Sequence, residues 1–233
     1  MSINLQPITA TLGAEVSGVD MASVDGETFD QLCKAWLDHK VLVVRDQHIT
    51  VEEHIAFGRL FGDLEVHPFA QGKTGHPEIV SLSSTPEDQN AASIWHSDVT
   101  WRQEPSMGSI LRGVVIPPVG GDTCFADAGA AYDDLSDEWK ERIDPLVAIH
   151  DFTRTFGRDL SPEKQTEMQR KYPPARHPVV RTHPETGKRS IYTNRIFVSH
   201  IEGVPEDESL EIIRYLERKI MNPSVQCRIR WEV

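Results

Sequence analysis

The chain has 233 residues, 39% of them hydrophobic, which suits a single domain spanning residues 1–233 around one sizeable core. Its formal net charge of −12 provides no basic face for a phosphate backbone, so nucleic acid is excluded as a partner. Because no apolar run approaches the roughly 18 residues of a membrane span and the N-terminus lacks a secretory leader, we expect a cytoplasmic protein without a membrane partner.

The N-terminal part of the chain predicts two helices around one short strand. Hydrophobic residues recur with helical spacing along Gly26–Lys40, which predicts a helix whose buried stripe is Phe29, Leu32, Cys33, Trp36 and Leu37. The apolar run Lys40–Arg45 then predicts a fully buried strand. Thr50 followed three residues later by Glu53 forms a capping box, which predicts a second helix with an inward side of Ile55, Phe57 and Leu60.

Further strands and one long helix are expected in the rest of the chain. Strands are predicted at Glu78–Leu82 and Ser109–Ile116, and Pro184–Gly187 is expected to be the turn of a hairpin, because Gly187 can adopt a left-handed conformation. Pro205 opens an amphipathic helix with acidic residues in its first turn and a packed face of Leu210, Ile213, Leu216 and Ile220.

The last segment predicts a strand that reaches the final residue. From Val225 to Val233, apolar and polar residues alternate strictly. Because natural termini usually end in a few loosely held residues, a core strand without a tail indicates a chain that has been cut short. Many short strands, Gly/Pro turns and a few helices predict a mainly β fold with flanking helices, a double-stranded β-helix (jelly roll) that is incomplete at the C-terminus.

Histidine and aspartate, rather than cysteine, are the candidate metal ligands. The cysteines lie far apart and outside any CxxC pattern, which argues against a disulfide framework and a structural zinc site. His96 and Asp98 are two residues apart, so at a strand end both side chains can reach one ion. With a distant second histidine, such a pair makes a facial triad that leaves three positions open on Fe(II). A surface His–Asp pair is the alternative that the triplet alone favours.

Three motifs give the chain a family resemblance. They are Trp95-His-Ser-Asp-Val-Thr-Trp101, Gly120-Gly-Asp-Thr-Cys-Phe125 and His177-Pro-Val-Val-Arg-Thr-His-Pro-Glu-Thr-Gly187. Together they resemble the taurine dioxygenase and aryloxyalkanoate dioxygenase family of Fe(II)/2-oxoglutarate-dependent enzymes. The resemblance begins near Gly13–Asp20 and continues to Arg228–Trp231, so it covers essentially the entire chain.

The resemblance implies a role for several residues. His96 and Asp98 match the first two iron ligands, and Thr123 matches the residue that hydrogen-bonds the distal carboxylate of 2-oxoglutarate. Four residues match positions near the substrate, with core packing as the alternative for the two phenylalanines: His67, Val99, Phe152 and Phe197. The family's third ligand, a histidine, and its 2-oxoglutarate-binding arginine lie beyond the Trp231 strand. None of four histidines of this chain is expected to act as that third ligand: His150, His177, His183 and His200.

The implied reaction is hydroxylation of a small organic acid, with Fe(II) as the metal, 2-oxoglutarate and O2 as co-substrates, and succinate and CO2 as products. Taurine is disfavoured because Ala70 and Ala92 stand where taurine enzymes have a tyrosine and an asparagine. An amine without a polar partner costs about 1–3 kcal/mol on desolvation. We therefore expect an acid with a bulky apolar body, of the aryloxyalkanoate, alkyl sulfate or sulfonate type, and leave homo-oligomerisation open.

Two other classes of protein remain as alternatives. A non-catalytic jelly-roll protein, either a remnant or a partner subunit that lacks the complete iron site, predicts no iron uptake. A metal-dependent hydrolase using the same histidine and aspartate with Zn(II) predicts turnover without oxygen or 2-oxoglutarate.

Overall fold

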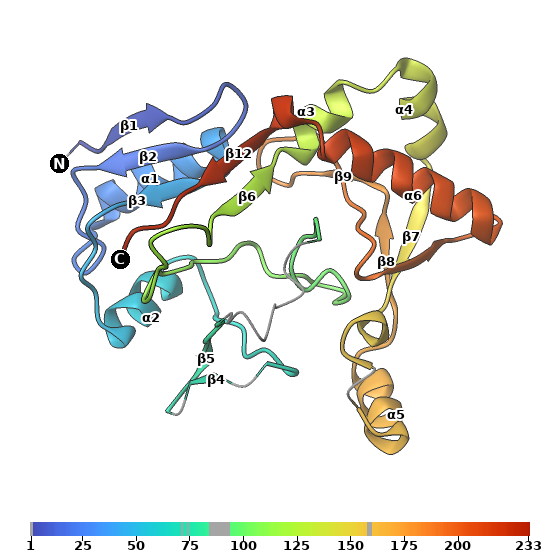
Figure 1. Cartoon of the computed structure of the whole chain (residues 1–233), viewed down its shortest axis with the longest axis horizontal. Helices are drawn as coiled ribbons and strands as arrows, with labels where there is room; N and C mark the ends of the chain where they lie inside the picture. The colour runs from blue at the N-terminus through green and yellow to red at the C-terminus, as the bar shows by residue number, and fades with distance from the viewer. Residues whose placement is uncertain (1, 71, 74, 84–93, 158–159) are drawn as a thin grey trace. The chain divides into compact units, whose positions relative to one another are not determined.

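The computed structural model describes residues 2–70, 72–73, 75–83, 94–157 and 160–233 (Figure 1). The chain forms two compact units, each assembled from segments that lie far apart in the sequence. Unit 1 contains Met1–Ser83, Gly108–Asp127 and Gln226–Val233, and unit 2 contains Ser84–Met107 and Ala128–Val225. That residues 1–233 act as one domain stays a prediction.

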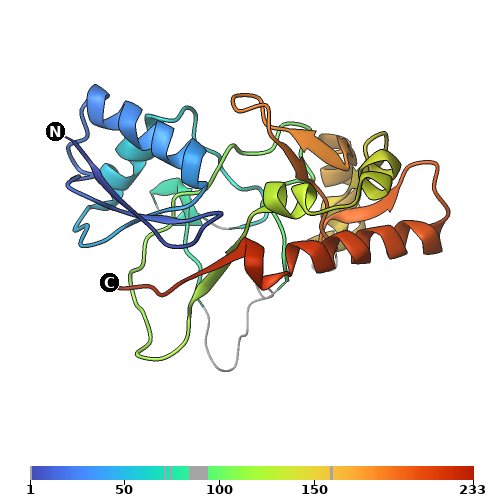
Figure 2. The ribbon, with the colours of Figure 1, turned by 90° about the horizontal axis from the view of Figure 1, so that it is seen from above.

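Unit 1 begins with a three-stranded sheet in the order β1-β2-β3, built from β1 (Asn4–Pro7), β2 (Ala14–Ser17) and β3 (Leu42–Val44). β1 and β2 are antiparallel, whereas β2 and β3 are parallel. The helix α1 (Gly26–His39) connects the two parallel strands and lies along the sheet (Figure 2). This helix confirms the helix predicted over Gly26–Lys40, but of its predicted buried stripe only Leu32 is buried, and the other four residues are half-buried. The strand β3 is likewise half-buried rather than fully buried.

The second predicted helix is present as α2 (Val51–Arg59), and its capping box is complete. The Glu53 N–H donates to Thr50 Oγ1 at 3.1 Å, and the Thr50 N–H donates to Glu53 Oε2 at 2.6 Å. Ile55 and Phe57 face inward as predicted, but Leu60 is 46% exposed. The prediction for Leu60 is wrong: Leu60 is the C-cap residue of α2, and the buried residues of the helix, Ile55, Phe57 and Gly58, all precede it.

Unit 1 also contains a strand pair formed by β6 (Thr123–Ala126) and β12 (Gln226–Ile229), which lie side by side in Figure 1. The predicted strand to Val233 is therefore too long, since Ile229 pairs with Thr123 and the ladder stops there. The physical reason lies just before β6, where Gly120 and Gly121 have positive φ angles of 82° and 75°, which are not strand conformations, so β6 cannot extend toward them. Beyond Ile229 the chain has no partner strand in the described part of unit 1, and Val233 is 75% exposed.

Two other strand predictions in unit 1 need correction. The strand expected at Glu78–Leu82 is β5 (His76–Val80), which pairs with β4 (Gly72–Lys73). Ser109–Ile116 forms no strand, and its side chains include the exposed Val114 and Val115, at 68% and 88%. An apolar, β-branched sequence becomes a strand only when a neighbouring strand pairs with it, and no sheet neighbour exists for this segment among the described residues.

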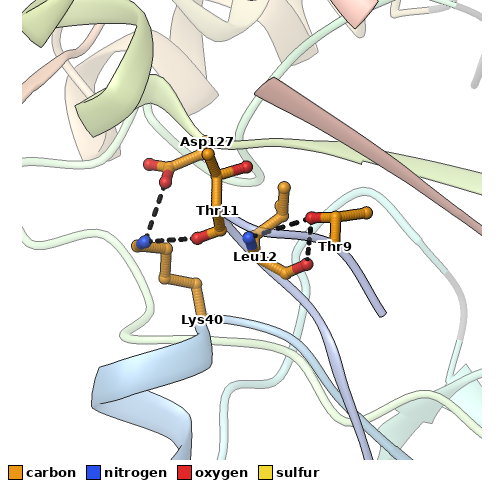
Figure 3. A network of polar contacts seen from close by, with 5 residues as sticks. All are labelled: Thr9, Thr11, Leu12, Lys40 and Asp127. Atoms are coloured by element: carbon orange, nitrogen blue, oxygen red, sulfur yellow. Dashed lines mark hydrogen bonds and ion pairs between the residues drawn. The ribbon is translucent and has the colours of Figure 1, made fainter. Parts of the chain in front are cut away.

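A polar network in unit 1 joins the end of α1 to the end of β6 (Figure 3). Lys40 ends α1 with a positive φ of 66°, and its Nζ donates to the backbone oxygen of Thr11 at 2.7 Å. The same Nζ lies 2.7 Å from the carboxylate of Asp127, the residue after β6, which is only 5% exposed. Because a buried carboxylate is costly without a partner, this ion pair fixes the strand that begins with Thr123.

Unit 2 contains a three-stranded antiparallel sheet in which β7 (Val147–His150) lies between β8 (Ala175–Pro178) and β11 (Val198–Ile201). The predicted hairpin is confirmed as β9 (Val180–Thr182) and β10 (Arg189–Ile191), with Gly187 at a φ of 68° in the turn. Because β7 pairs with β8, His150 and His177 lie on neighbouring strands. In this register Ala148 lies directly opposite His177.

The helices of unit 2 are α3 (Ala128–Asp133), α4 (Asp137–Ile143), α5 (Pro162–Lys171) and α6 (Glu206–Ile220), with short 3-10 helices at Phe152–Arg154 and Pro223–Val225. α6 confirms the helix predicted after Pro205. Its buried stripe contains Ile212, Ile213 and Leu216, whereas Leu210 is 39% exposed, so that part of the prediction is wrong. The stripe begins at Ser209, which leaves Leu210 beside it rather than on it.

Within the described residues, strands outnumber helices, and no helix is long and apolar enough to cross a bilayer. Among the described residues, Cys33, Cys124 and Cys227 form no disulfide bond.

Candidate metal centre

The His96–Asp98 segment lies in unit 2 and brings the two predicted ligands together. His96 Nε2 is 3.3 Å from Asp98 Oδ1, and the side chains are 26% and 64% exposed. Two ligands bound about 2.1 Å from one ion at a right angle lie about 3 Å apart. The observed separation therefore fits two neighbouring positions of one metal ion.

The other ring nitrogen of His96 determines what this pair can bind. Its Nδ1 lies 2.6 Å from the backbone oxygen of Ile94, and since a carbonyl only accepts, Nδ1 carries a proton. In the neutral ring, Nε2 then turns a lone pair toward the Asp98 carboxylate. Two electron-rich atoms this close need a cation between them, either a proton or a metal ion. The hydrogen bond to Asp98 accordingly raises the pKa of His96.

The pair supplies two ligands of a larger set. Among the described residues, no group of three or more histidine, cysteine, aspartate or glutamate side chains is arranged to hold a metal. The structure gives other contacts to the remaining histidines that the sequence left unassigned. The Nδ1 atom of His183 accepts backbone N–H groups in the hairpin turn, and the Nδ1 atom of His200 lies 2.9 Å from Ser199 Oγ.

The backbone directly after Asp98 is strained. Val99 has a φ of 47°, a left-handed conformation that costs an L residue about 1–2 kcal/mol. A β-branched residue adopts it especially rarely. The Arg102 N–H donates to the Val99 backbone oxygen at 2.9 Å and closes the turn. Val99 and Thr100 are both buried, at 6% and 1% exposed.

A buried polar cluster holds this turn, and sequence analysis did not identify it. Thr100 Oγ1 lies 2.9 Å from His150 Nδ1 and accepts from Asn194 Nδ2 at 3.3 Å. His177 Nε2 lies 2.8 Å from the Arg102 backbone oxygen, so Nε2–H donates to it. Burial, together with the nearby His177, lowers the pKa of His150 to about 3, which keeps this ring neutral. The residues that make these contacts are 50 to 94 positions apart in the sequence, so no local sequence pattern predicts them.

Three of the predicted substrate residues lie in the interior of unit 2. Val99, Phe152 and Phe197 are 6%, 1% and 5% exposed. The ring of Phe152 meets Trp101 edge-to-face at 6.0 Å, and Phe197 lies 6.2 Å from Phe156. Such burial suits an apolar wall and also suits the packing alternative, so their contact with substrate stays a prediction.

The remaining predicted site residues, Thr123 and His67, belong to unit 1. Thr123 opens β6, and its Oγ1 accepts from Trp231 Nε1 at 2.8 Å, which leaves the hydroxyl proton for donation. His67 Nδ1 accepts the N–H groups of Phe69 and Ala70 at 3.2 and 2.9 Å. In the neutral ring the proton is therefore on Nε2, a donor suited to an anion. Ala92 lies outside the described residues.

The sequence of the chain matches known proteins along nearly its full length. The sequence model of the family "Taurine catabolism dioxygenase TauD, TfdA family" matches residues 4–233. An alkylsulfatase from Acinetobacter baylyi is 33% identical, over 99% of this chain and 74% of the relative. An (S)-phenoxypropionate/alpha-ketoglutarate-dioxygenase from Sphingobium herbicidovorans is 32% identical, over 94% of this chain and 78% of the relative.

Solved structures resemble the chain to a similar extent. A taurine dioxygenase from Burkholderia xenovorans superposes with a TM-score of 0.84 at 35% identity, covering 100% of this chain and 77% of the other. AAD-2, solved in complex with Mn(II) and N-oxalylglycine, superposes with a TM-score of 0.82 at 29% identity, covering 100% of this chain and 84% of the other.

Proposed function

Since the chain belongs to the TauD, TfdA family of dioxygenases, we propose that it hydroxylates a small organic acid of the aryloxyalkanoate, alkyl sulfate or sulfonate type. Family membership makes it a 2-oxoglutarate-dependent dioxygenase that uses Fe(II) and O2, and it confirms the predicted mainly β, jelly-roll fold with flanking helices. When bound, the iron and the keto acid supply the oxidising chemistry: one oxygen atom of O2 enters a substrate C–H bond, and 2-oxoglutarate becomes succinate and CO2.

The observation that carries the proposal is the His96–Asp98 pair. The imidazole is oriented by the Ile94 carbonyl, and its Nε2 lies 3.3 Å from the carboxylate oxygen, so the pair can hold one ion through one nitrogen and one oxygen. In this assignment the two side chains bind the iron, and the carboxylate balances part of its charge. Imidazole and carboxylate leave open positions for exchangeable ligands, which suits Fe(II) oxygenase chemistry.

Thr123 and His67 are assigned to the two anions that the reaction uses. The Thr123 hydroxyl accepts from Trp231 and has its proton available, which supports donation to the distal carboxylate of 2-oxoglutarate. The His67 ring has its proton on Nε2, which supports donation to the acidic group of the substrate. Val99, Phe152 and Phe197 are assigned to the apolar body of the substrate because of their character and burial.

The substrate is expected to be an anion with an apolar body rather than a zwitterion. The relatives named above act on an alkyl sulfate ester, by the name alkylsulfatase, and on (S)-phenoxypropionate. Ala70 offers only a methyl side chain at a position where an ammonium group would need a polar partner. Leaving that partner out costs about 1–3 kcal/mol, which selects against taurine.

The first test is an anaerobic titration of the purified protein with Fe(II) and then 2-oxoglutarate, followed by visible absorption. We expect the weak charge-transfer band of an iron–keto acid chelate. His96→Ala should abolish the band, whereas His48→Ala, at an exposed histidine outside the site, should preserve it. Unchanged Fe(II) affinity in His96→Ala would overturn the ligand assignment.

Substrate class is tested separately by measuring O2 consumption and succinate release with a panel of acids. Phenoxypropionate and medium-chain alkyl sulfates should be turned over faster than taurine. Preference for taurine over both apolar acids would contradict the substrate proposal and leave the metal assignment intact.

A further inference from the structure

We propose that Thr100, His150 and Asn194 form a buried clamp whose function is to hold the strained Val99 turn and thereby aim the Asp98 carboxylate at the metal. The inference rests on the proposed function, because it needs Asp98 as a ligand. Thr100, His150 and Asn194 would be positioning residues, since they act through the turn rather than by touching the iron.

Asp98 precedes a residue, Val99, whose backbone conformation is unfavourable unless other contacts stabilise it. Val99 is β-branched and has a φ of 47°, which L residues avoid because Cβ approaches the carbonyl oxygen. Such conformations persist only where surrounding contacts determine them, and they gather at functional sites. Within the turn, the Arg102 N–H donates to the Val99 backbone oxygen at 2.9 Å.

The side chain next in sequence is fixed from two directions. The Thr100 hydroxyl bonds His150 Nδ1 at the end of β7 and the Asn194 amide from the loop before β11. Asn194 is itself held, because its Oδ1 accepts the Phe197 N–H at 2.8 Å. Thr100, His150 and Asn194 are 1%, 0% and 4% exposed, so water does not compete for these bonds.

A second contact fixes the other end of the turn. His177, on β8 beside β7, donates to the backbone oxygen of Arg102 at 2.8 Å. The turn from Asp98 to Arg102 is therefore attached to two paired strands, once through a side chain and once through the backbone. Two attachments on rigid strands restrict rotation of the peptide that carries the Asp98 carboxylate.

His150 is a poor choice for packing alone. Its ring is 0% exposed, yet its Nε2 makes no hydrogen bond within the part of the chain that the structure describes. A buried polar atom without a partner lowers stability, so an apolar side chain of similar shape would pack at lower cost. The Nδ1 bond to Thr100 is the contact that an apolar residue could not provide.

Co(II) binding in the presence of 2-oxoglutarate tests the clamp without relying on turnover, because the visible spectrum of Co(II) reports both affinity and geometry. Thr100→Val removes the hydroxyl at nearly constant volume. We expect its Co(II) dissociation constant to rise about 10–100-fold, the usual effect of losing a partner that orients a ligand. Thr100→Ser keeps the hydroxyl and should restore affinity and spectrum.

Val99→Gly provides the decisive combination. Glycine adopts a positive φ without strain, so the turn needs the clamp less in its presence. The loss of affinity caused by Thr100→Val should therefore be clearly smaller in the Val99→Gly background than in the native background. Equal losses in both backgrounds would show that the hydroxyl does not act through the strained turn, and would overturn the inference.

The matched control for a merely structural role is Ser209→Ala. Ser209 is also a buried hydroxyl of unit 2, 1% exposed, and its Oγ accepts the Ile201 N–H at 2.7 Å. Both Ser209→Ala and Thr100→Val should lower thermal stability, but only Thr100→Val should weaken Co(II) binding. Loss of stability with unchanged Co(II) affinity in Thr100→Val would reduce the clamp to ordinary packing and sink the proposal.

If Thr100→Val does not fold, the pair His150→Asn and His150→Leu asks the same question. Asparagine can place a polar atom near the position of Nδ1, whereas leucine of similar size cannot, so Co(II) affinity should survive in the first and fall in the second. His96→Ala separates the two proposals. If it binds Co(II) like the native protein, the ligand assignment itself fails; if it loses binding while the Thr100 and His150 variants retain it, only the clamp fails.

Discussion

The two units stabilise a residue at positive φ with different kinds of polar contact. Each contains a non-glycine residue at positive φ beside a predicted site segment: Lys40, at 66°, is attached to the end of the Thr123 strand, and Val99, at 47°, follows Asp98. Unit 1 uses a charged pair, Lys40 with Asp127, whose lysine is 35% exposed. Unit 2 uses neutral hydrogen bonds around His150, which is 0% exposed.

The difference follows from the water available at each place. A lysine that keeps part of its side chain in solvent can stay charged and still reach a buried carboxylate. A fully buried imidazole stays neutral instead, and burial with the nearby His177 lowers the pKa of His150 to about 3. The two networks should therefore respond differently to loss of a partner.

The largest effect is expected from breaking the ion pair of unit 1. Lys40→Met leaves Asp127 buried without its cation, so the free energy of unfolding should fall by about 3 kcal/mol. Urea unfolding measures it. Lys164→Met, at an exposed pair with Glu167, serves as the control and should cost less than about 1 kcal/mol. Equal effects would mean that burial of Asp127 does not determine the strength of the network.

Acidification should act on the His150 network of unit 2. The unfolded chain protonates His150 near pH 6.5, whereas the folded chain does not until about pH 3, so the contribution of this neutral ring to stability is lost as the pH falls below 6.5. At about 1.4 kcal/mol per pH unit, the loss between pH 6.5 and 4.5 is roughly 2–3 kcal/mol.

Urea unfolding at both pH values, on the native protein and on His150→Asn, isolates this contribution from the protonation of carboxylates. The native protein should lose more stability than the variant. Parallel pH profiles would contradict the assignment of the acid sensitivity to His150.

The smallest effect is expected from a purely local contact. Thr50→Ala removes one half of the capping box of α2 and should cost about 1 kcal/mol. Because the cap lies at an exposed helix end, Co(II) affinity should not change. An effect as large as that of Lys40→Met would show that α2 is more tightly coupled to the rest of unit 1 than its packing indicates.

Predictions from sequence patterns were correct where the stabilising contacts join residues only a few positions apart. The capping box at Thr50, the helix after Pro205 and the hairpin turn at Gly187 each depend on neighbours three to five positions away, and all three are present. The closeness of His96 and Asp98, 3.3 Å apart, also follows from their short spacing, whereas their role as metal ligands stays a prediction.

The errors lie where a distant partner decides the outcome. Ser109–Ile116 has the composition of a strand but no neighbour in the described sheets, and the strand after Val225 ends at Ile229 because its partner β6 begins at Thr123. Leu60 and Leu210 were expected on the packed faces of their helices, yet Leu60, at the C-cap of α2, and Leu210, beside the buried stripe of α6, are exposed.

The sequence by itself determined the family, the capped helices, the hairpin turn and the closeness of His96 to Asp98, because those features depend on residue type and short spacing. Only the tertiary structure decided which residues hold that pair in place. Thr100 meets His150 and Asn194 across 50 and 94 residues, and such contacts arise from strand pairing and burial rather than from any local pattern.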